Sequence, residues 1–235
     1  MIKKIAMVFN SEVRSMLKWS LGIILILSPV IFPQAHLDDE FAGSYRKRAK
    51  TSIVRSLSTD HISRVKKFDN LDKLLIYLPR DEFVRDKYPD LKIHSGDPQR
   101  RKIEELHNVE VTCWVHAVKY EGGNGDRDFH IIVGDLPDTA DATFMNVEVS
   151  GLPPATSHNY QPLREVRKEF LDLFEDYNFT TSFKRIDPPR KVKIKGSLFF
   201  DGGHNHSCGT CPGPSYAKPG TVWEIHPIYS IIGVN

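Results

Sequence analysis

The stretch Val109–Ala117, with the sequence VEVTCWVHA, decides the fold class of this 235-residue chain. Its apolar side chains stand at every second position, and Glu110, Thr112 and His116 are among the residues between them. Strict alternation over this length is the period of a half-buried β-strand and not of a helix. We therefore predict a strand with one face toward a core. Cys113 belongs to that face, so its thiol is expected to be buried and unreactive.

Four further segments show the same alternation, and one shows helical periodicity. The alternating segments are 128–133, 145–149, 191–200 and 221–231, and the helical one is 162–177. The resulting order is strand, strand, strand, helix, strand, strand, which is the order of an oligonucleotide/oligosaccharide-binding (OB) barrel, a five-stranded Greek-key sheet. We predict a mainly β fold in which residues 105–235 form an OB-like barrel with a helix between its third and fourth strands. The alternative is an open, mixed α+β sheet.

An uncharged segment, WSLGIILILSPVIF at 19–32, follows Arg14 and Lys18 near the N-terminus. Its length and flanking charge are typical of the hydrophobic region of a signal peptide, whereas a spanning helix needs about 20 apolar residues. We predict that residues 1–35 are a signal peptide cleaved after Ala35. The alternative is an uncleaved N-terminal anchor, which would be the protein's one contact with a membrane. The chain is thus expected to be exported, to the periplasm or the cell exterior.

Residues 36–104 lack the alternating pattern, and we expect them to form a helical extension that precedes the barrel. Ser52 can cap a helix whose apolar stripe runs from Ile53 to Phe68. The segment LDKLLIYL at 71–78 fits a second, short helix.

Composition and charge exclude several classes of protein. With 40% hydrophobic and 26% charged residues, the chain is neither disordered nor fibrous. Residues 36–235 contain 28 Lys and Arg against 29 Asp and Glu, because four basic residues and one Glu lie in 1–35. Such a balance argues against strong nonspecific binding of nucleic acid.

One candidate nucleic-acid face remains, in which outward lysines accompany aromatic rings that can stack on bases. Its residues are Trp114, Lys191, Lys193, Lys195 and Phe199. Alternating lysines on an exposed strand also keep a sheet edge soluble. We therefore expect a protein or a small molecule as the partner rather than a nucleic acid.

Because side chains along a strand point alternately to its two faces, the predicted strands place polar side chains on the face of the sheet opposite the apolar core. If Phe129 and Ile131 point to the core, their neighbours Asp128 and His130 point outward. The same argument turns three residues of the third and last strands outward, and the OB arrangement makes these strands neighbours. They are Glu148, Glu224 and His226, with Asp126, Asp201 and His204 placed to reach the rim. We predict one surface patch of carboxylates and imidazoles.

These segments also resemble a known pattern. The sequences DRDFH at 126–130, VEV at 147–149, FFDGGH at 199–204 and WEIHP at 223–227 resemble those of a widespread group of uncharacterised bacterial exported proteins. In that group D-x-D-x-H, a Glu-containing third strand, F-F-D-x-x-H and E-x-H-P recur in this order. The resemblance covers about residues 105–231 and implies that the eight polar residues named above belong together. It brings no established activity.

Imidazole and carboxylate groups together suit one divalent metal ion, with His130, His226 and Glu148 as candidate ligands. An open site of this kind can activate water. The alternative is that these groups bond to each other and fix the register of the strands. Separately, Cys208 and Cys211 form a C-x-x-C that can close as a disulfide in an oxidising compartment, or bind a metal together with His204 and His206.

The sequence favours an exported OB-like binding or accessory module that uses the polar patch. The alternative is a metal-dependent hydrolase of the phosphodiesterase or nuclease type that uses the same residues. Whether the chain is an enzyme is left open, because a Gly-rich phosphate loop, a G-x-S-x-G elbow and an H-E-x-x-H motif are all absent from the sequence.

Overall fold

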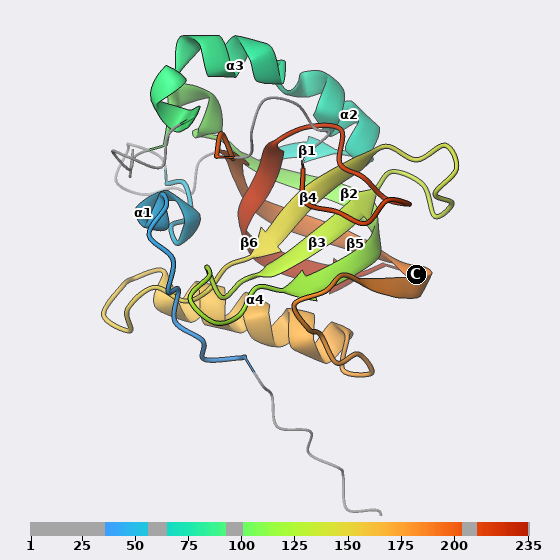
Figure 1. Ribbon diagram of the computed structural model, residues 1–235. Helices are drawn as coiled ribbons and strands as arrows, with labels where there is room; N and C mark the ends of the chain where they lie inside the picture. Colours follow the sequence, from blue (N-terminus) through green and yellow to red (C-terminus); the bar gives the residue numbers. More distant parts are fainter. Residues whose placement is uncertain (1–35, 56–64, 93–100, 204–210, 235) are drawn as a thin grey trace, which may run out of the picture. The chain divides into compact units, whose positions relative to one another are not determined.

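Six strands dominate the computed structural model, which describes residues 36–55, 65–92, 101–203 and 211–234 (Figure 1). The strands are β1 (Lys66–Phe68), β2 (Asn108–Tyr120), β3 (Phe129–Gly134), β4 (Phe144–Val149), β5 (Lys184–Phe200) and β6 (Trp223–Gly233). The helices are α1 (Lys47–Lys50), α2 (Leu71–Tyr77), α3 (Asp81–Lys87) and α4 (Tyr160–Leu173), with short 3-10 turns η1 (Pro89–Lys92) and η2 (Ile103–Glu105). All of these belong to one compact unit, Gln34–Asn235. The predicted leader, 1–35, lies outside the described residues.

The strands form one mixed sheet that closes on itself. Their order is β1-β2-β3-β4-β6-β5, and β5 pairs back with β2 to complete a ring of five strands. The pairs β1–β2 and β4–β6 are parallel, and the others are antiparallel. The sheet is thus closed rather than open, and the predicted succession of three strands, a helix and two strands is confirmed.

The interior of the ring is filled by the alternating apolar residues that the sequence pattern identified. Val111, Cys113 and Val115 of β2 are fully or almost fully buried there. Burial raises the pKa of the Cys113 thiol, as expected for a group far from water. In Figure 1, α4 lies below the strands and α2 and α3 lie above them. The apolar stripe of α4 joins the core, where Phe170 stands 4.9 Å from the ring of Phe129.

The predicted helices of the N-terminal part have different outcomes. The helix at 71–78 is confirmed as α2, and Asn70 caps it by accepting a hydrogen bond from the Lys73 amide at 3.1 Å. The prediction of a helix from Ser52 to Phe68 is wrong at both ends, since residues 52–54 are irregular and Phe68 lies in β1. The residues between, 56–64, lie outside the described part.

Contacts with the ring explain why the chain at Ser52 is not helical. The amide of Val54 donates to Ser197 Oγ at 2.9 Å, and its carbonyl accepts from Asn108 at 2.8 Å. These backbone groups are therefore bonded to β5 and β2 and not to neighbours along a helix. Within the described residues, no helix is long and apolar enough to cross a bilayer.

Candidate functional site

The polar side chains that strand parity predicted do meet on one face of the sheet. In the β3–β4 pair His130 lies opposite Glu148, and in the β4–β6 pair Asn146 lies opposite Glu224. Side chains two residues apart share a face, so these strands direct their polar groups to the same place. We define the buried cluster as Asp128, His130, Glu148, Glu224 and His226.

The prediction of a surface patch is wrong, because all five members of the buried cluster are withdrawn from solvent. Asp128 and His226 are 0% exposed, and His130, the most exposed, reaches only 5%. The covering layer comes from the chain before the ring. The Lys50 ammonium at the end of α1 forms an ion pair with Asp126 and is itself buried.

A second basic residue, Arg46, holds this covering layer in place through a buried ion pair. The Arg46 guanidinium donates to both oxygens of Glu105, at 2.8 and 2.7 Å, and neither side chain is exposed. It also lies over the ring of Phe199, 4.6 Å from the centroid. We call Phe41–Val54 the covering segment. The covering segment is distant in sequence from the strands of the cluster. The alternation of residues within those strands therefore could not predict that this segment covers them.

His130 is held between carboxylates on both sides of its ring. Its Nδ1 lies 2.8 Å from Glu148 Oε1, and its Nε2 lies 2.6 Å from Glu121 Oε2 and 3.3 Å from Asp128 Oδ1. Burial alone would lower its pKa, but the charges of Glu148 and Asp128 outweigh burial and raise the pKa well above the usual value.

Glu148 lies between the two imidazoles. His226 Nδ1 is 2.6 Å from Glu148 Oε2, while Oε1 accepts a hydrogen bond from Asn146 at 2.7 Å. Burial by itself would raise the pKa of Glu148, but the charges of His130 and His226 hold it well below the usual range. In turn, although burial lowers the pKa of His226, Glu148 raises it to about 9.

The other two carboxyls are protonated more readily than usual. Burial, and then the charge of Glu148, raise the pKa of Asp128 to about 6 and that of Glu224 to about 7. Asn146 donates to Glu224 at 2.8 Å, which joins it to Glu148. The cluster thus contains groups that exchange protons near neutral pH and groups whose charge is fixed.

Two triads within this region have the spacing of metal ligands, with candidate ligand atoms within 4.8 Å of one another. They are Asp128 with Glu148 and His226, and Asp128 with Glu121 and His130. The sequence placed His130 and His226 in one ligand set, but the structure places them in different triads.

The fully buried triad of Asp128, Glu148 and His226 contains atoms that make no hydrogen bond to any described residue. They are both carboxylate oxygens of Asp128, Oε2 of Glu148 and both ring nitrogens of His226. Buried polar atoms are nearly always bonded to protein, water or an ion. His226 Nδ1 forms an ion pair with Glu148 Oε2 at 2.6 Å, and Asp128 Oδ1 lies 3.3 Å from His130 Nε2. Asp128 Oδ2 and His226 Nε2 have neither a hydrogen bond nor an ion pair within the described residues.

The remaining predicted residues lie around the cluster or outside the described part. Asp126 bonds Lys50, and Asp201 is buried close enough for its charge to raise the pKa values of Lys50 and Glu224. His204 lies outside the described residues. So do His206 and Cys208, and with them the predicted disulfide to Cys211 and the alternative metal site in that loop.

The candidate nucleic-acid face is only partly assembled. Lys191 stands opposite Trp114 with its ammonium 5.6 Å from the indole, and Lys193 and Lys195 follow on the same strand. Lys195 also pairs with Glu110 at 3.1 Å. Phe199 is fully buried against His226 and Arg46, so its assignment to an exposed stacking face is wrong.

Several residues of the site were not predicted from the sequence. Asn146 shares the parity of Glu148, so the same pattern would have found it. Glu121 lies just before the turn that leads into β3, and only the closed hairpin brings it to His130. Arg46 and Lys50 have no sequence signal, because they reach the ring from a separate part of the chain.

Comparison with protein-family models, with curated proteins and with solved structures finds no match for this chain. The resemblance to bacterial exported proteins stays a prediction.

Proposed function

We propose that the chain is an exported, OB-like binding module whose buried cluster holds one divalent transition-metal ion. Support for the OB-like fold comes from the ring. Its five strands β2, β3, β4, β5 and β6 close on themselves, α4 connects the third to the fourth, and the third and fifth are parallel neighbours. A Greek-key barrel of this class has that arrangement.

The single observation that carries the metal proposal is the ligand spacing of the buried triad Asp128, Glu148 and His226, in which Asp128 Oδ2 and His226 Nε2 have no partner among the described residues. An unsatisfied buried polar group costs about 1–3 kcal/mol. One divalent ion would satisfy a ligand atom from each of the three side chains at once. Two carboxylates with an imidazole are a ligand set that zinc and similar ions accept.

Neighbouring residues hold the triad as outer-shell residues hold metal ligands. Glu148 Oε1 is fixed by Asn146 at 2.7 Å and lies 2.8 Å from His130, which leaves Oε2 directed at His226. Such contacts orient a ligating carboxylate and are a regular part of metal sites.

Burial argues against hydrolysis at this site. A catalytic metal keeps an open coordination position that the substrate can reach, but the three ligands are at most 1% exposed beneath the covering segment. The hydrolase alternative therefore has no observation in its favour in this conformation, and we place the metal as a buried element of a binding module.

The test is metal content. The full chain is stripped with a chelator, loaded in turn with Zn²⁺, Co²⁺ and Mn²⁺, and freed of excess ion before elemental analysis. We expect one ion per chain, lost in Asp128→Asn and in His226→Gln. The control is His116→Gln, which removes a buried imidazole bonded instead to the Leu136 carbonyl at 2.8 Å.

The control protein should keep its ion, and circular dichroism should show that Asp128→Asn remains folded. A wild-type chain that retains none of the three ions contradicts the proposal. Retention of the ion by both cluster variants contradicts it as well.

A further inference from the structure

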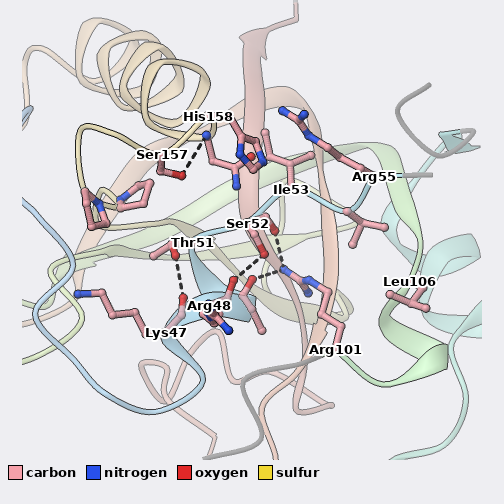
Figure 2. Close-up of a pocket in the computed structure, with 15 residues that line it drawn as sticks. Lys47, Arg48, Thr51, Ser52, Ile53, Arg55, Arg101, Leu106, Ser157 and His158 are labelled. Carbon is pink, nitrogen blue, oxygen red and sulfur yellow. Dashed lines mark hydrogen bonds between the residues drawn. The ribbon is translucent and has the colours of Figure 1, made fainter. Parts of the chain in front are cut away.

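A second site lies apart from the buried cluster, in a pocket of about 820 Å³ next to the N-terminal end of α4 (Figure 2). We call it the basic pocket. Its walls come from Lys47–Arg55, from the chain on either side of η2, and from the loop that leads into α4. None of the five members of the buried cluster lines it.

The lining of the basic pocket is strongly positive. Lys47, Arg48, Arg55 and Arg101 line it, and none of the described lining residues is Asp or Glu. A concave surface lined by charges of one sign concentrates their field and attracts ligands of the opposite sign. The pocket therefore suits an anion.

Arg101 is a charge fixed within the wall. Its guanidinium donates to the carbonyls of Ala49 at 2.5 Å, Ser52 at 3.2 Å and His226 at 2.6 Å, and also to that of Leu198. These acceptors are neutral, so they orient the group without cancelling its charge. Its Nε is buried and has no hydrogen-bond partner in the described part of the chain.

The end of α4 adds to this positive field. Ser157, His158 and Asn159 line the pocket directly before the 14-residue helix, and Figure 2 shows Ser157 and His158 across from Lys47 and Arg48. The first turn of α4 contains no acidic residue, and Asn159 makes no side-chain cap. The partial positive charge of a helix N-terminus favours anions, phosphates in particular.

Asn159 offers a further contact. Its side chain is 4% exposed, and Oδ1 has no hydrogen-bond partner. A ligand hydroxyl can donate to this oxygen. Around these polar groups, Ile53, Val54 and Leu106 supply apolar wall, and the volume lies in the range of small-molecule sites, about 300–1,000 Å³.

We infer that the basic pocket binds a small organic phosphate of about nucleotide size, with its phosphate toward the arginines and the end of α4. Arg48 and Arg55 are exposed in the lining, and the planar guanidinium of an arginine matches phosphate oxygens in pairs. The near-neutral charge of residues 36–235 argues against a long nucleic-acid strand. This site is independent of any metal in the buried cluster.

The test is isothermal titration of the full chain with adenosine 5′-monophosphate, with adenosine as the matched uncharged probe. We expect the monophosphate to bind at least about tenfold more tightly, because a charge-assisted contact is lost with the phosphate. Equal binding of the two probes overturns the inference. So does absence of monophosphate binding, or affinity for oligothymidylates that rises steadily with their length.

Variants locate the site. Arg48→Glu/Arg55→Glu reverses two exposed charges of the lining and should weaken binding of the monophosphate at least about tenfold, with an unchanged melting temperature. Lys184→Glu/Lys218→Glu changes the net charge equally at exposed residues outside the lining. This control variant should bind the monophosphate as tightly as the wild type does. An equal loss of affinity in both variants would show that only the net charge of the protein matters, and it would overturn the inference.

Discussion

Arg46→Met is the most informative perturbation of the covering segment. Arg46 and Glu105 are both 0% exposed and joined by two hydrogen bonds, at 2.8 and 2.7 Å. Methionine preserves much of the side chain's volume but leaves the Glu105 carboxylate buried without its partner. The carboxylate keeps the amides of Lys102 and Phe200, which donate at 2.5 and 2.9 Å.

The expected loss of stability in Arg46→Met follows from the burial of this ion pair. Removal of one partner of a buried ion pair lowers the free energy of unfolding by about 3–5 kcal/mol. In urea, a chain of this size has an m-value of about 2 kcal/mol/M. The unfolding midpoint should therefore fall by about 2 M. Lys73→Met is the control, because the Lys73–Asp69 pair has a similar distance, 2.5 Å, but exposed partners, and it should leave the unfolding midpoint close to that of the wild type.

Urea unfolding followed by circular dichroism measures these changes. In Arg46→Met/Glu105→Gln the uncompensated charge is gone while an amide oxygen still accepts from the Phe200 amide. The double variant should therefore be more stable than Arg46→Met alone. Two results would contradict a stabilising role of the buried ion pair in the covering segment. One is a loss of less than about 1 kcal/mol in the free energy of unfolding of Arg46→Met, and the other is a double variant less stable than Arg46→Met.

Three further predictions concern the interior. Lys50→Met removes a cation whose charge acts on Glu148 and Asp128, and it should therefore strengthen Zn²⁺ binding at least about tenfold in titrations; an unchanged Kd in Lys50→Met would contradict this. The pKa of Glu224 is raised to about 7, so its stabilising effect is present below its unfolded pKa and is lost as pH rises through 7. In urea unfolding of the metal-free proteins, Glu224→Gln should therefore gain about 2–3 kcal/mol relative to the wild type between pH 5 and pH 8, and a pH-independent difference would oppose that reading. The Cys113 thiol, buried and with a raised pKa, should not react with a disulfide reagent until urea unfolds the chain; rapid labelling of the native protein at Cys113 would show that the core is open.

The parts of the fold that follow from local periodicity could be predicted. Val109–Ala117 is a strand because its alternation lets one face fill the ring. Most of 162–177 is helical, as part of α4 (Tyr160–Leu173), because its apolar residues form one stripe. The same parity argument brought His130 and Glu148 to one face, and the register of β3 and β4 places them opposite each other.

What could not be predicted depends on contacts between distant parts of the chain. Parity places His226 on the outer face of its strand, but whether that face meets water depends on Lys50 and the rest of the covering segment. Phe199 was assigned to an exposed face for the same reason, and it is buried beneath Arg46. The apolar stripe after Ser52 is not a helix at its two described ends, because Val54 bonds the ring and Phe68 pairs with β2.

In the proposed metal site, Asp128, Glu148 and His226 hold one ion. The most direct test of this site is anomalous X-ray diffraction, at the zinc absorption edge, from crystals of the zinc-loaded chain. We expect one strong peak about 2.0–2.2 Å from an Asp128 oxygen and a His226 nitrogen. No peak between these side chains, or a peak only at the loop that contains Cys208 and Cys211, would contradict the proposal.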